Sequence, residues 1–332
     1  MNISTLKGER KMQIKRFRKV TIVSVTTMLF ILTLLMMLPF AAAYVPGACV
    51  YASSVGVPVT IDGVWSAGEW DDTLQYIMTN STGGNVGYVR AKFNSTHLLI
   101  IIDSPWDTTN STVYYHENVW LAFDTLNDGG ANPQWDDYLV HATTSWTSMG
   151  WMGSGNNWTQ TWLGWAGTVA CVQAGENFGW GTPLGASPNS ATPHRISEMA
   201  VPLALVGSPG STVGFYVQVD DDSTDPDGTG WLPSTAYSEW PPNAGGSPGW
   251  PAGWFGSAPC PAPNAWGNLQ MMLIGDVNND NKVDIFDLRI AAKAFGSTPS
   301  DPDWNPIVDL DNNGLIDVFD LRKIAKHYGE TA

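Results

Sequence analysis

The chain has 332 residues, enough for one large or two smaller domains with a hydrophobic core. It is acidic, with 31 Asp and Glu against 16 Lys and Arg and a net charge of −15. Between Val45 and Met272 the only basic residues are Arg90, Lys92 and Arg195. Because binding to phosphate backbones requires clustered Lys and Arg, nucleic acid and anionic lipid are excluded as partners of this segment.

The first 44 residues have the pattern of an export signal. Residues 1–20 hold seven Lys and Arg and one Glu, residues 21–40 are apolar, and three alanines follow at 41–43. We expect a signal peptide cleaved after Ala43; the alternative is an uncleaved membrane anchor, since the apolar run nearly spans a bilayer. Either way the rest of the chain is expected outside the cytoplasm, secreted or on the cell surface. Cleavage leaves nine Lys and Arg against 30 Asp and Glu, a net charge of −21.

Cysteines and sequons fit an exported chain. Three cysteines, Cys49, Cys171 and Cys260, allow one disulfide and one free thiol, and their spacing fits no zinc site. N-x-T sequons are expected glycan acceptors on surface loops of a glycoprotein. The sequons begin at Asn80, Asn94, Asn110 and Asn157.

From about residue 59 to residue 273 the sequence predicts an all-β segment. Short apolar or alternating runs are separated by clusters of Gly, Pro, Asn and Asp, without a long helical period. This pattern is typical of a β-sandwich of the jelly-roll or immunoglobulin-like kind. Residues 223–263, rich in Pro, Gly, Trp and Ser, are expected to be a functional loop region or poorly ordered. The expected strands are residues 88–93, 97–103, 119–124, 138–143, 168–173, 212–220 and 266–273.

The C-terminal part contains an internal repeat with an offset of 33 residues. Residues 276–296 and 309–329 are identical at ten of 21 positions, and each opens with an EF-hand-like loop. Such loops bind Ca²⁺ through positions 1, 3, 5, 7, 9 and 12, with position 7 using its carbonyl. Carboxylate and amide oxygens suit Ca²⁺ better than a softer metal. The expected ligands are Asp276, Asn278, Asp280, Lys282, Asp284 and Asp287 in the first loop, and Asp309, Asp311, Asn313, Leu315, Asp317 and Asp320 in the second.

A helix that ends at a glycine is expected after each loop. Gly314 supplies the sharp turn at position 6 of the second loop, and Asn281 takes its place in the first. Asn tolerates the positive φ that such a turn requires. The expected apolar stripes are Leu288, Ala291, Ala292 and Phe295 before Gly296, and Leu321, Ile324, Ala325 and Tyr328 before Gly329.

A duplicated loop and helix with Asp at position 12 resembles the type I dockerin domain, over residues 275–329. The resemblance implies a small all-α domain at 275–332 that folds with two Ca²⁺ and docks onto a cohesin-like module. Bulky apolar pairs replace the small or hydroxylated residues of cellulosomal dockerins and look like those of archaeal surface proteins. Core packing is the alternative role of Phe286 and Phe319. The partner-facing positions implied are Ile285, Phe286, Lys293, Val318, Phe319 and Lys326.

Residues 45–272 contain 16 of the 17 tryptophans. Sugars stack their apolar C–H faces on aromatic rings, so an acidic, Trp-rich sandwich fits carbohydrate binding. Trp120 and Trp266, inside or beside expected strands, are expected to be buried. Tryptophans in loop-like contexts are the candidates for ligand contact. These candidates are Trp135, Trp231, Trp240, Trp250 and Trp254.

The order of segments in this part also carries a resemblance. VTIDGVWSAGEWDDT (59–73), NVWLAFDTLNDGGANPQWDDYLV (118–140) and STVGFYVQVDDDS (211–223) follow one another as in the carbohydrate-binding module family 9-like, DOMON-related β-sandwich. The resemblance, assigned to residues 45–274, implies binding of glycan or polysaccharide and structural calcium. Three carboxylates that surround a Gly/Asn turn are further candidates for calcium, but solvated turn carboxylates are the favoured interpretation. These candidates are Asp124, Asp128 and Asp137.

Together these features predict a non-catalytic cell-surface protein that binds carbohydrate and docks through its calcium tail. The first alternative is a glycoside hydrolase, which needs two placed carboxylates; neither G-x-S-x-G nor H-E-x-x-H occurs. A haem protein like relatives of the DOMON sandwich would need axial ligands, and a structural envelope protein is the third alternative. The candidate carboxylates are Glu69, Glu117, Glu176, Glu198 and Glu239, and the candidate haem ligands are Met149, Met152, His116 and His141.

Overall fold

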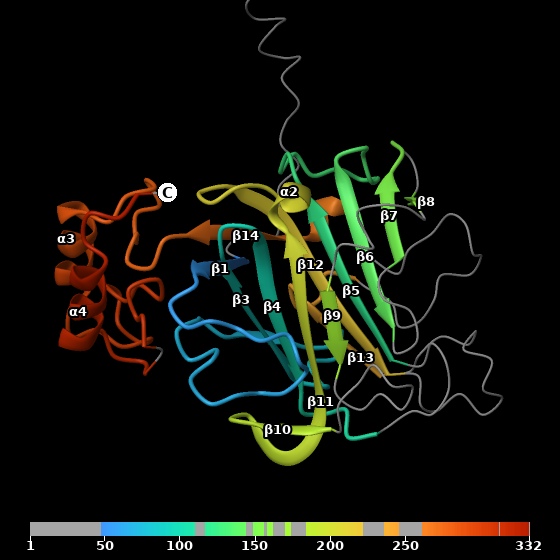
Figure 1. The fold of residues 1–332 in the computed structure, drawn as a ribbon, viewed down its shortest axis with the longest axis horizontal. Coiled ribbons are helices and arrows are strands. Elements are labelled where there is room, and N and C mark those ends of the chain that lie inside the picture. Colours follow the sequence, from blue (N-terminus) through green and yellow to red (C-terminus); the bar gives the residue numbers. More distant parts are fainter. Residues whose placement is uncertain are drawn as a thin grey trace, which may run out of the picture. The chain divides into compact units, whose positions relative to one another are not determined.

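The computed structural model describes residues 48–109, 117–143, 149–155, 158–161, 170–173, 184–221, 236–245, 261–311 and 313–331. Within these ranges the chain is mainly β with few helices (Figure 1), consistent with the expected β-sandwich. The export segment, with its apolar run at 21–40, lies outside them. In the part of the chain that is described, no helix combines the length and apolar character needed to cross a membrane.

The strands pair into one sheet in the order β10-β11-β4-β3-β1-β14-β12-β5-β6-β7-β8, with β13 beside β12, β2 beside β3 and β9 beside β11. Two short helical turns, α2 (Leu203–Val206) and η2 (Pro263–Ala265), interrupt the connections. The strands are β1 (Cys49–Ser54), β2 (Tyr76–Met78), β3 (Gly87–Phe93), β4 (His97–Ser104), β5 (Glu117–Asp124), β6 (Asp137–Thr143), β7 (Met149–Gly153), β8 (Trp158–Thr161), β9 (Ala170–Gln173), β10 (Gly185–Ser187), β11 (Ser190–Pro202), β12 (Thr212–Asp221), β13 (Ala236–Trp240) and β14 (Gly267–Met272).

The expected strands are confirmed to within two residues at each end where the structure describes them. Most neighbours pair antiparallel, whereas β1 runs parallel to both β14 and β3. The longest strand, β11, was not among the expected ones. Its inner residues are apolar, but His194, Arg195 and Glu198 are buried polar residues that break the alternation a half-buried strand usually shows.

One hydrophobic core draws residues from both halves of the strand order. Ile100 of β4 and Met199 of β11 come from one half, and Leu121 of β5 and Val217 of β12 come from the other. All four are fully buried. A sheet whose two halves share a core in this way has the packing of a sandwich, in which the two inner faces enclose the apolar side chains.

Two further clusters lie on the outer faces of this sheet. The segment before β2 packs Trp70 against Leu99, Ile101 and Ile196, so it covers β4 and β11. Around β5, β6, β7, β8 and β12, a second cluster is rich in aromatic rings. It contains the buried Trp120 and Trp266, whose burial was expected, together with Trp151, Trp158 and Tyr216.

The C-terminal residues carry a separate hydrophobic cluster around two helices, α3 (Ile285–Ala294) and α4 (Val318–Lys326). Val283 exchanges two backbone hydrogen bonds with Gly329 and Glu330, after α4. Ile316 makes the same pair of bonds with the segment after α3, 33 residues earlier. Each loop is therefore tied to the end of the other repeat's helix, which gives the pair an internal two-fold symmetry.

The apolar stripes of these helices are narrower than expected. Ala291, Ala294 and Ile324 are buried, but Phe295 and Tyr328 are 55% and 54% exposed. Ala292 and Ala325 are exposed as well. The predicted stripes extended to Phe295 and Tyr328, at the helix ends. These two side chains are exposed because Gly296 and Gly329, which follow them, adopt positive φ and turn the chain away.

Two of the four sequons lie in described turns. Asn80 and Asn94 each accept hydrogen bonds at Oδ1 from the threonine of their own sequon. Asn110 and Asn157 lie outside the described residues. Cys49 is a half-buried free thiol, and burial raises its pKa to about 11.

Candidate functional site

The first acid of each C-terminal loop holds the loop's own backbone. The Asp276 carboxylate accepts hydrogen bonds from the backbone N–H groups of Asp280 and Asn281 at 3.1 and 2.9 Å. Asp309 accepts the same two bonds, at the same distances, from the residues 33 positions further on. Asn281 and Gly314 both have positive φ, 66° and 79°, which confirms the expected turn at position 6.

The last acid of each loop closes the loop onto its helix. Asp287 accepts from the N–H groups of Val277, Asn278 and Asp284 at 2.9, 3.2 and 2.7 Å. Asp320 accepts from the three equivalent groups of the second loop at 2.8, 3.3 and 2.8 Å. Asp287 and Asp320 are also the third residues of α3 and α4 and complete a capping box in each.

Carboxylates crowd together inside these loops. In the second loop, oxygens of Asp309, Asp311 and Asp320 lie within 4.8 Å of one another, and Asp309 and Asp320 are buried. Burial and then neighbouring carboxylates raise the pKa of Asp276 above the ordinary aspartate value. Burial also raises the pKa of Asp287. Buried like charges are unfavourable unless a cation balances them, so the donor set fits a hard divalent ion such as Ca²⁺.

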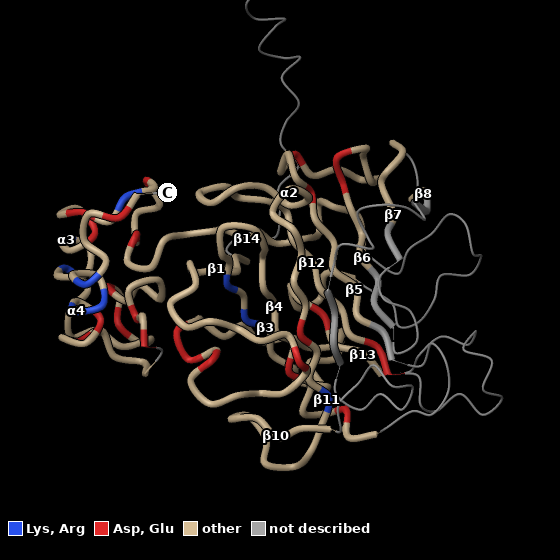
Figure 2. The backbone as a smooth tube through the Cα atoms, viewed as in Figure 1, with Lys and Arg blue, Asp and Glu red and all other residues tan. Residues whose placement is uncertain are grey.

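The positions that the sequence predicts to face a partner are exposed. Ile285, Phe286, Val318 and Phe319 are each more than half exposed at the starts of α3 and α4, so Phe286 and Phe319 do not pack in the core. Lys293 and Lys326 are exposed near the ends of the same helices. Figure 2 shows Lys and Arg along α3 and α4, which hold five of the nine basic residues beyond residue 44.

In the sandwich, Trp135 alone among the described tryptophans is classed as exposed, at 67%. It lies in the loop that joins β5 to β6, together with Leu126, which is 60% exposed. An exposed indole at a loop position offers an apolar face to solvent. It can stack on the C–H face of a sugar ring, with polar residues beside it to meet the hydroxyls.

Of the other tryptophans predicted to contact sugar, one is buried and three lie outside the described residues. Trp240 lies in strand β13, is 4% exposed and packs on Phe215 with ring centroids 5.7 Å apart. The expected loop position of Trp240 is therefore wrong, because a short strand beside β12 carries its ring into the core. Trp231, Trp250 and Trp254 lie outside the described residues.

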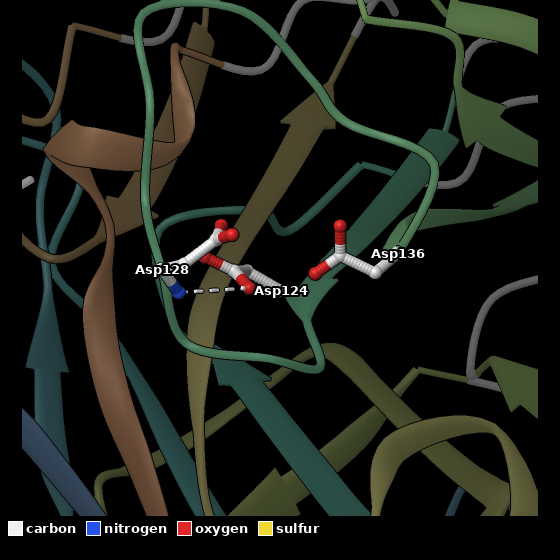
Figure 3. Close-up of side chains that lie close together, drawn as sticks. All are labelled: Asp124, Asp128 and Asp136. Carbon is white, nitrogen blue, oxygen red and sulfur yellow. Dashed lines mark hydrogen bonds between the residues drawn. The ribbon is translucent and has the colours of Figure 1, made fainter. Parts of the chain in front are cut away.

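Three carboxylates, from the end of β5 and from the loop that carries Trp135, lie close together (Figure 3). Asp124 ends β5, Asp128 lies in the loop, and Asp136 follows Trp135; each offers an oxygen within 4.8 Å of the others. Asp124 and Asp136 are buried, whereas Asp128 is exposed. The solvated-turn interpretation that the sequence favoured is therefore wrong for Asp124 and Asp137, which are buried. Asp136, which the sequence did not single out, joins Asp124 and Asp128 in the cluster, and Asp137 is buried next to it.

Backbone donors hold these carboxylates in place. Asp124 accepts from the N–H of Gly129 at 2.7 Å and of Asp128 at 3.4 Å, the bond drawn in Figure 3. Asp136 accepts from the N–H of Leu126 at 3.3 Å. Burial raises the pKa of Asp137 to about 8, and the charges of Asp124, Asp136 and Asp128 add to this effect. These acids make the site electronegative.

The described glutamates of the sandwich have structural partners. Glu198 accepts from the Trp70 indole and from two backbone N–H groups, and Glu69 accepts from the N–H of Thr60. Glu239 accepts from the Tyr216 hydroxyl at 2.9 Å. All three are buried. Glu176 and His116 lie outside the described residues, as do the side chains of Glu117, His141 and Met149.

Comparison with known proteins does not assign a function to this chain. No family model matches the chain, and no curated protein matches it. A family 9 carbohydrate-binding module from Caldicellulosiruptor kristjanssonii, solved with cellotriose, is 17% identical over 69% of this chain and 95% of its own, with a TM-score of 0.41. The same kind of module solved with glucose is 16% identical over 69% and 97%, with a TM-score of 0.40. Similarities with TM-scores this low do not support a functional assignment. The function of this chain is therefore inferred from its own residues.

Proposed function

We propose that the chain is an exported, non-catalytic cell-surface protein whose sandwich binds carbohydrate and whose calcium-loaded tail docks onto a cohesin-like module. Exposure of Trp135 on a loop lined with carboxylates carries the carbohydrate part. An indole in water loses apolar hydration when a sugar ring covers it, and Asp128, exposed in the same loop, can accept hydrogen bonds from hydroxyl groups. Glu198 and Glu239 support a non-catalytic role, because their buried carboxylates already accept hydrogen bonds from the protein.

Trp135→Ala tests the sugar site. Binding of the full-length chain to soluble gluco-, xylo- and manno-oligosaccharides, measured by calorimetry, should fall at least tenfold in the variant. Trp135→Phe keeps an aromatic face and should retain part of the affinity. Leu126→Ala, which removes exposed apolar surface from the same loop, is the matched control and should bind as the parent does. Equal binding by Trp135→Ala and the parent would place the sugar site elsewhere.

The docking part rests on the duplicated loops and on the exposed pairs Ile285–Phe286 and Val318–Phe319. Because the two repeats present the same residue types in the same register, each can offer the same surface to one partner site. Exposed aromatic residues beside Lys293 and Lys326 fit a partner surface that is apolar at its centre and acidic at its rim. This symmetry predicts that the tail can bind one partner site in two orientations, which differ in the repeat that makes the contact.

The docking test uses recombinant cohesin modules with the full-length chain, with and without EGTA. Phe286→Ala or Phe319→Ala alone should weaken binding about twofold, because the other repeat still offers an intact surface. The double variant should lose about 2 kcal/mol or more, roughly 30-fold, as expected for a buried aromatic anchor. Phe295→Ala, exposed outside both pairs, is the control. No cohesin binding by the calcium-loaded parent would remove this half of the proposal without touching the sugar half.

A further inference from the structure

Trp135 stands at the corner of a tight turn at the start of β6. The N–H of Asp137 donates to the carbonyl of Gln134 at 3.0 Å, and a bond between residues three apart in this direction closes a β-turn. Trp135 and Asp136 are the two central residues of this turn. Asp136 is buried and Trp135 is 67% exposed, so the turn holds one side chain inside and displays the other to solvent.

Gly153 provides the surface on which this turn rests. Strand β7 pairs with β6 as far as Met152, opposite Tyr138, so the last residue of β7 lies next to the turn (Figure 1). A Cβ atom added to Gly153 would lie 1.8 Å from the carbonyl oxygen of Gln134, 2.6 Å from its carbonyl carbon and 2.7 Å from its backbone nitrogen. All three atoms belong to the backbone, which cannot swing aside as the end of a side chain can. The position therefore admits only glycine as long as the turn stays in place.

The need for glycine at this position is steric. The φ of Gly153 does not lie in the positive range that favours glycine. Gly155, two residues further on, has a φ of 91°, and a Cβ atom there would meet only the end of the Gln134 side chain, at 3.9 Å. The two glycines of this hairpin thus have different roles, because Gly155 turns the chain and Gly153 makes room for the backbone of Gln134.

Hydrogen bonds tie the turn to the same hairpin. Gly155 donates its N–H to the carbonyl of Pro133 at 2.9 Å. The side-chain amide of Gln134 donates to the carbonyls of Asn132 and Gly155 at 3.1 and 3.5 Å. The N–H of Gln134 donates to the carboxylate of Asp137 at 2.5 Å. The residue before the indole is therefore fixed by bonds as well as by packing.

The residue after Trp135 is fixed from another side. The carbonyl of Asp136 accepts from the N–H and Oγ1 of Thr125 at 3.4 and 3.0 Å, and its carboxylate accepts from the N–H of Leu126 at 3.3 Å. Both chain neighbours of Trp135 are thus held by segments outside the turn, Gln134 by the hairpin after β7 and Asp136 by the loop after β5. An aromatic ring on a fixed backbone loses little freedom when a ligand covers it, which favours binding.

We propose that Gly153 is a positioning residue for the proposed sugar site, because its missing side chain seats the turn that carries Trp135. A side chain at this position would displace the backbone of Gln134 and, with it, the indole. Gly153 is buried and acts only through Gln134. The consequence for sugar binding rests on the proposed function of Trp135, whereas the seating of the turn does not.

The seating is tested without sugar, by fluorine NMR of the full-length chain labelled with 5-fluorotryptophan. The signal of Trp135 is the one that Trp135→Phe removes. In Gly153→Ala this signal should shift, whereas the signal of Trp70, which packs on β4 and β11, should stay. Gly84→Ala is the matched control, because a Cβ atom on Gly84 would meet nothing closer than 3.5 Å and its φ is not positive. A Trp135 signal that stays in place in Gly153→Ala overturns the proposal.

Gln134→Ala keeps the test decisive if Gly153→Ala does not fold. It removes the amide that bonds to Asn132 and Gly155 and adds no atom to the contact. Thermal unfolding followed by tryptophan fluorescence shows which variants are folded. The Trp135 signal of folded Gln134→Ala should also shift, and an unchanged signal would show that this hairpin does not hold the turn.

The effect on sugar is measured by calorimetry with the oligosaccharides used for Trp135→Ala. Gly153→Ala should weaken binding about tenfold and Gln134→Ala about threefold, whereas Gly84→Ala should bind as the parent does. A shifted Trp135 signal with unchanged affinity overturns the link to sugar binding. If the parent binds no sugar, the proposed function fails and the link fails with it, whereas fluorine NMR still decides the seating.

Discussion

Glu198 is a buried acid whose ionisation works against the fold. Its Oε2 accepts from the N–H groups of Asp62 and Gly63, and its Oε1 accepts from the Trp70 indole, all at 2.9 Å. Burial nevertheless raises the pKa of Glu198 to about 7, because desolvation outweighs these three bonds. Between pH 4.5 and 7 the folded state therefore holds more protons than the unfolded state, and stability falls as pH rises through that window.

Glu198→Gln should remove this pH dependence. The difference in unfolding free energy between the parent and the variant should fall by up to about 3 kcal/mol from pH 4.5 to pH 7. Urea unfolding followed by tryptophan fluorescence measures it, because Glu198 anchors the loop that carries Trp70 on the sheet. Asp71→Asn serves as the control for a general charge effect. A difference that is flat across the window would show that Glu198 titrates normally.

His194 acts in the same direction by another route. Burial lowers its pKa, but the bond from Nε2 to Asp103 at 2.5 Å and the bond from Nδ1 to the Thr192 carbonyl at 2.6 Å reverse the effect, so the pKa is raised. The doubly protonated ring satisfies both acceptors. Its contribution is fully present below pH 6.5 and is lost as pH rises through the raised pKa.

His194→Gln should therefore cost most at low pH. We expect a loss of about 2 kcal/mol below pH 6, the worth of a charge-assisted hydrogen bond, and a smaller loss above pH 8. The measurement is the urea midpoint at both pH values. Asp103→Asn should show the same trend, because it removes the acceptor that favours the charged ring. A loss that grows with pH would contradict the protonated assignment.

In each loop-helix repeat, the residue that completes the capping box is also a proposed calcium ligand. Asp320 accepts three backbone N–H bonds and also belongs to the acid cluster of its loop. Asp320→Ala should therefore remove one bound Ca²⁺ and unfold α4, with a loss of ellipticity at 222 nm. The loss of unfolding free energy should exceed the roughly 0.5–2 kcal/mol that is typical of removing a helix cap alone. Asp303→Ala, exposed in the same tail, should leave both readings unchanged; full calcium stoichiometry in Asp320→Ala would contradict the ligand assignment.

The fold is most predictable from the sequence where a short local pattern fixes the geometry. The positive φ of Asn281 and Gly314 follows from the twelve-residue register of the loops, and apolar runs such as that of β4 predict strands directly. Strand β11 was not predicted, because its buried Glu198 bonds to a covering segment and its buried His194 bonds to Asp103 of β4, contacts that no local pattern shows. Asp136 was not among the expected acids either, since only the folded loop brings its carboxylate to Asp124 and Asp128.

Removal of calcium should unfold the C-terminal tail and leave the sandwich folded, because their hydrophobic cores differ in size. The tail cluster around Val283 and Ile316 is small, and domains with such cores usually need a metal to fold. The sandwich core spans most of its strands and should persist. With EGTA, helical ellipticity at 222 nm should be lost at room temperature, while the tryptophan fluorescence transition remains and only moves to a lower temperature. A single transition shared by both probes, with helices kept in EGTA, would contradict this division.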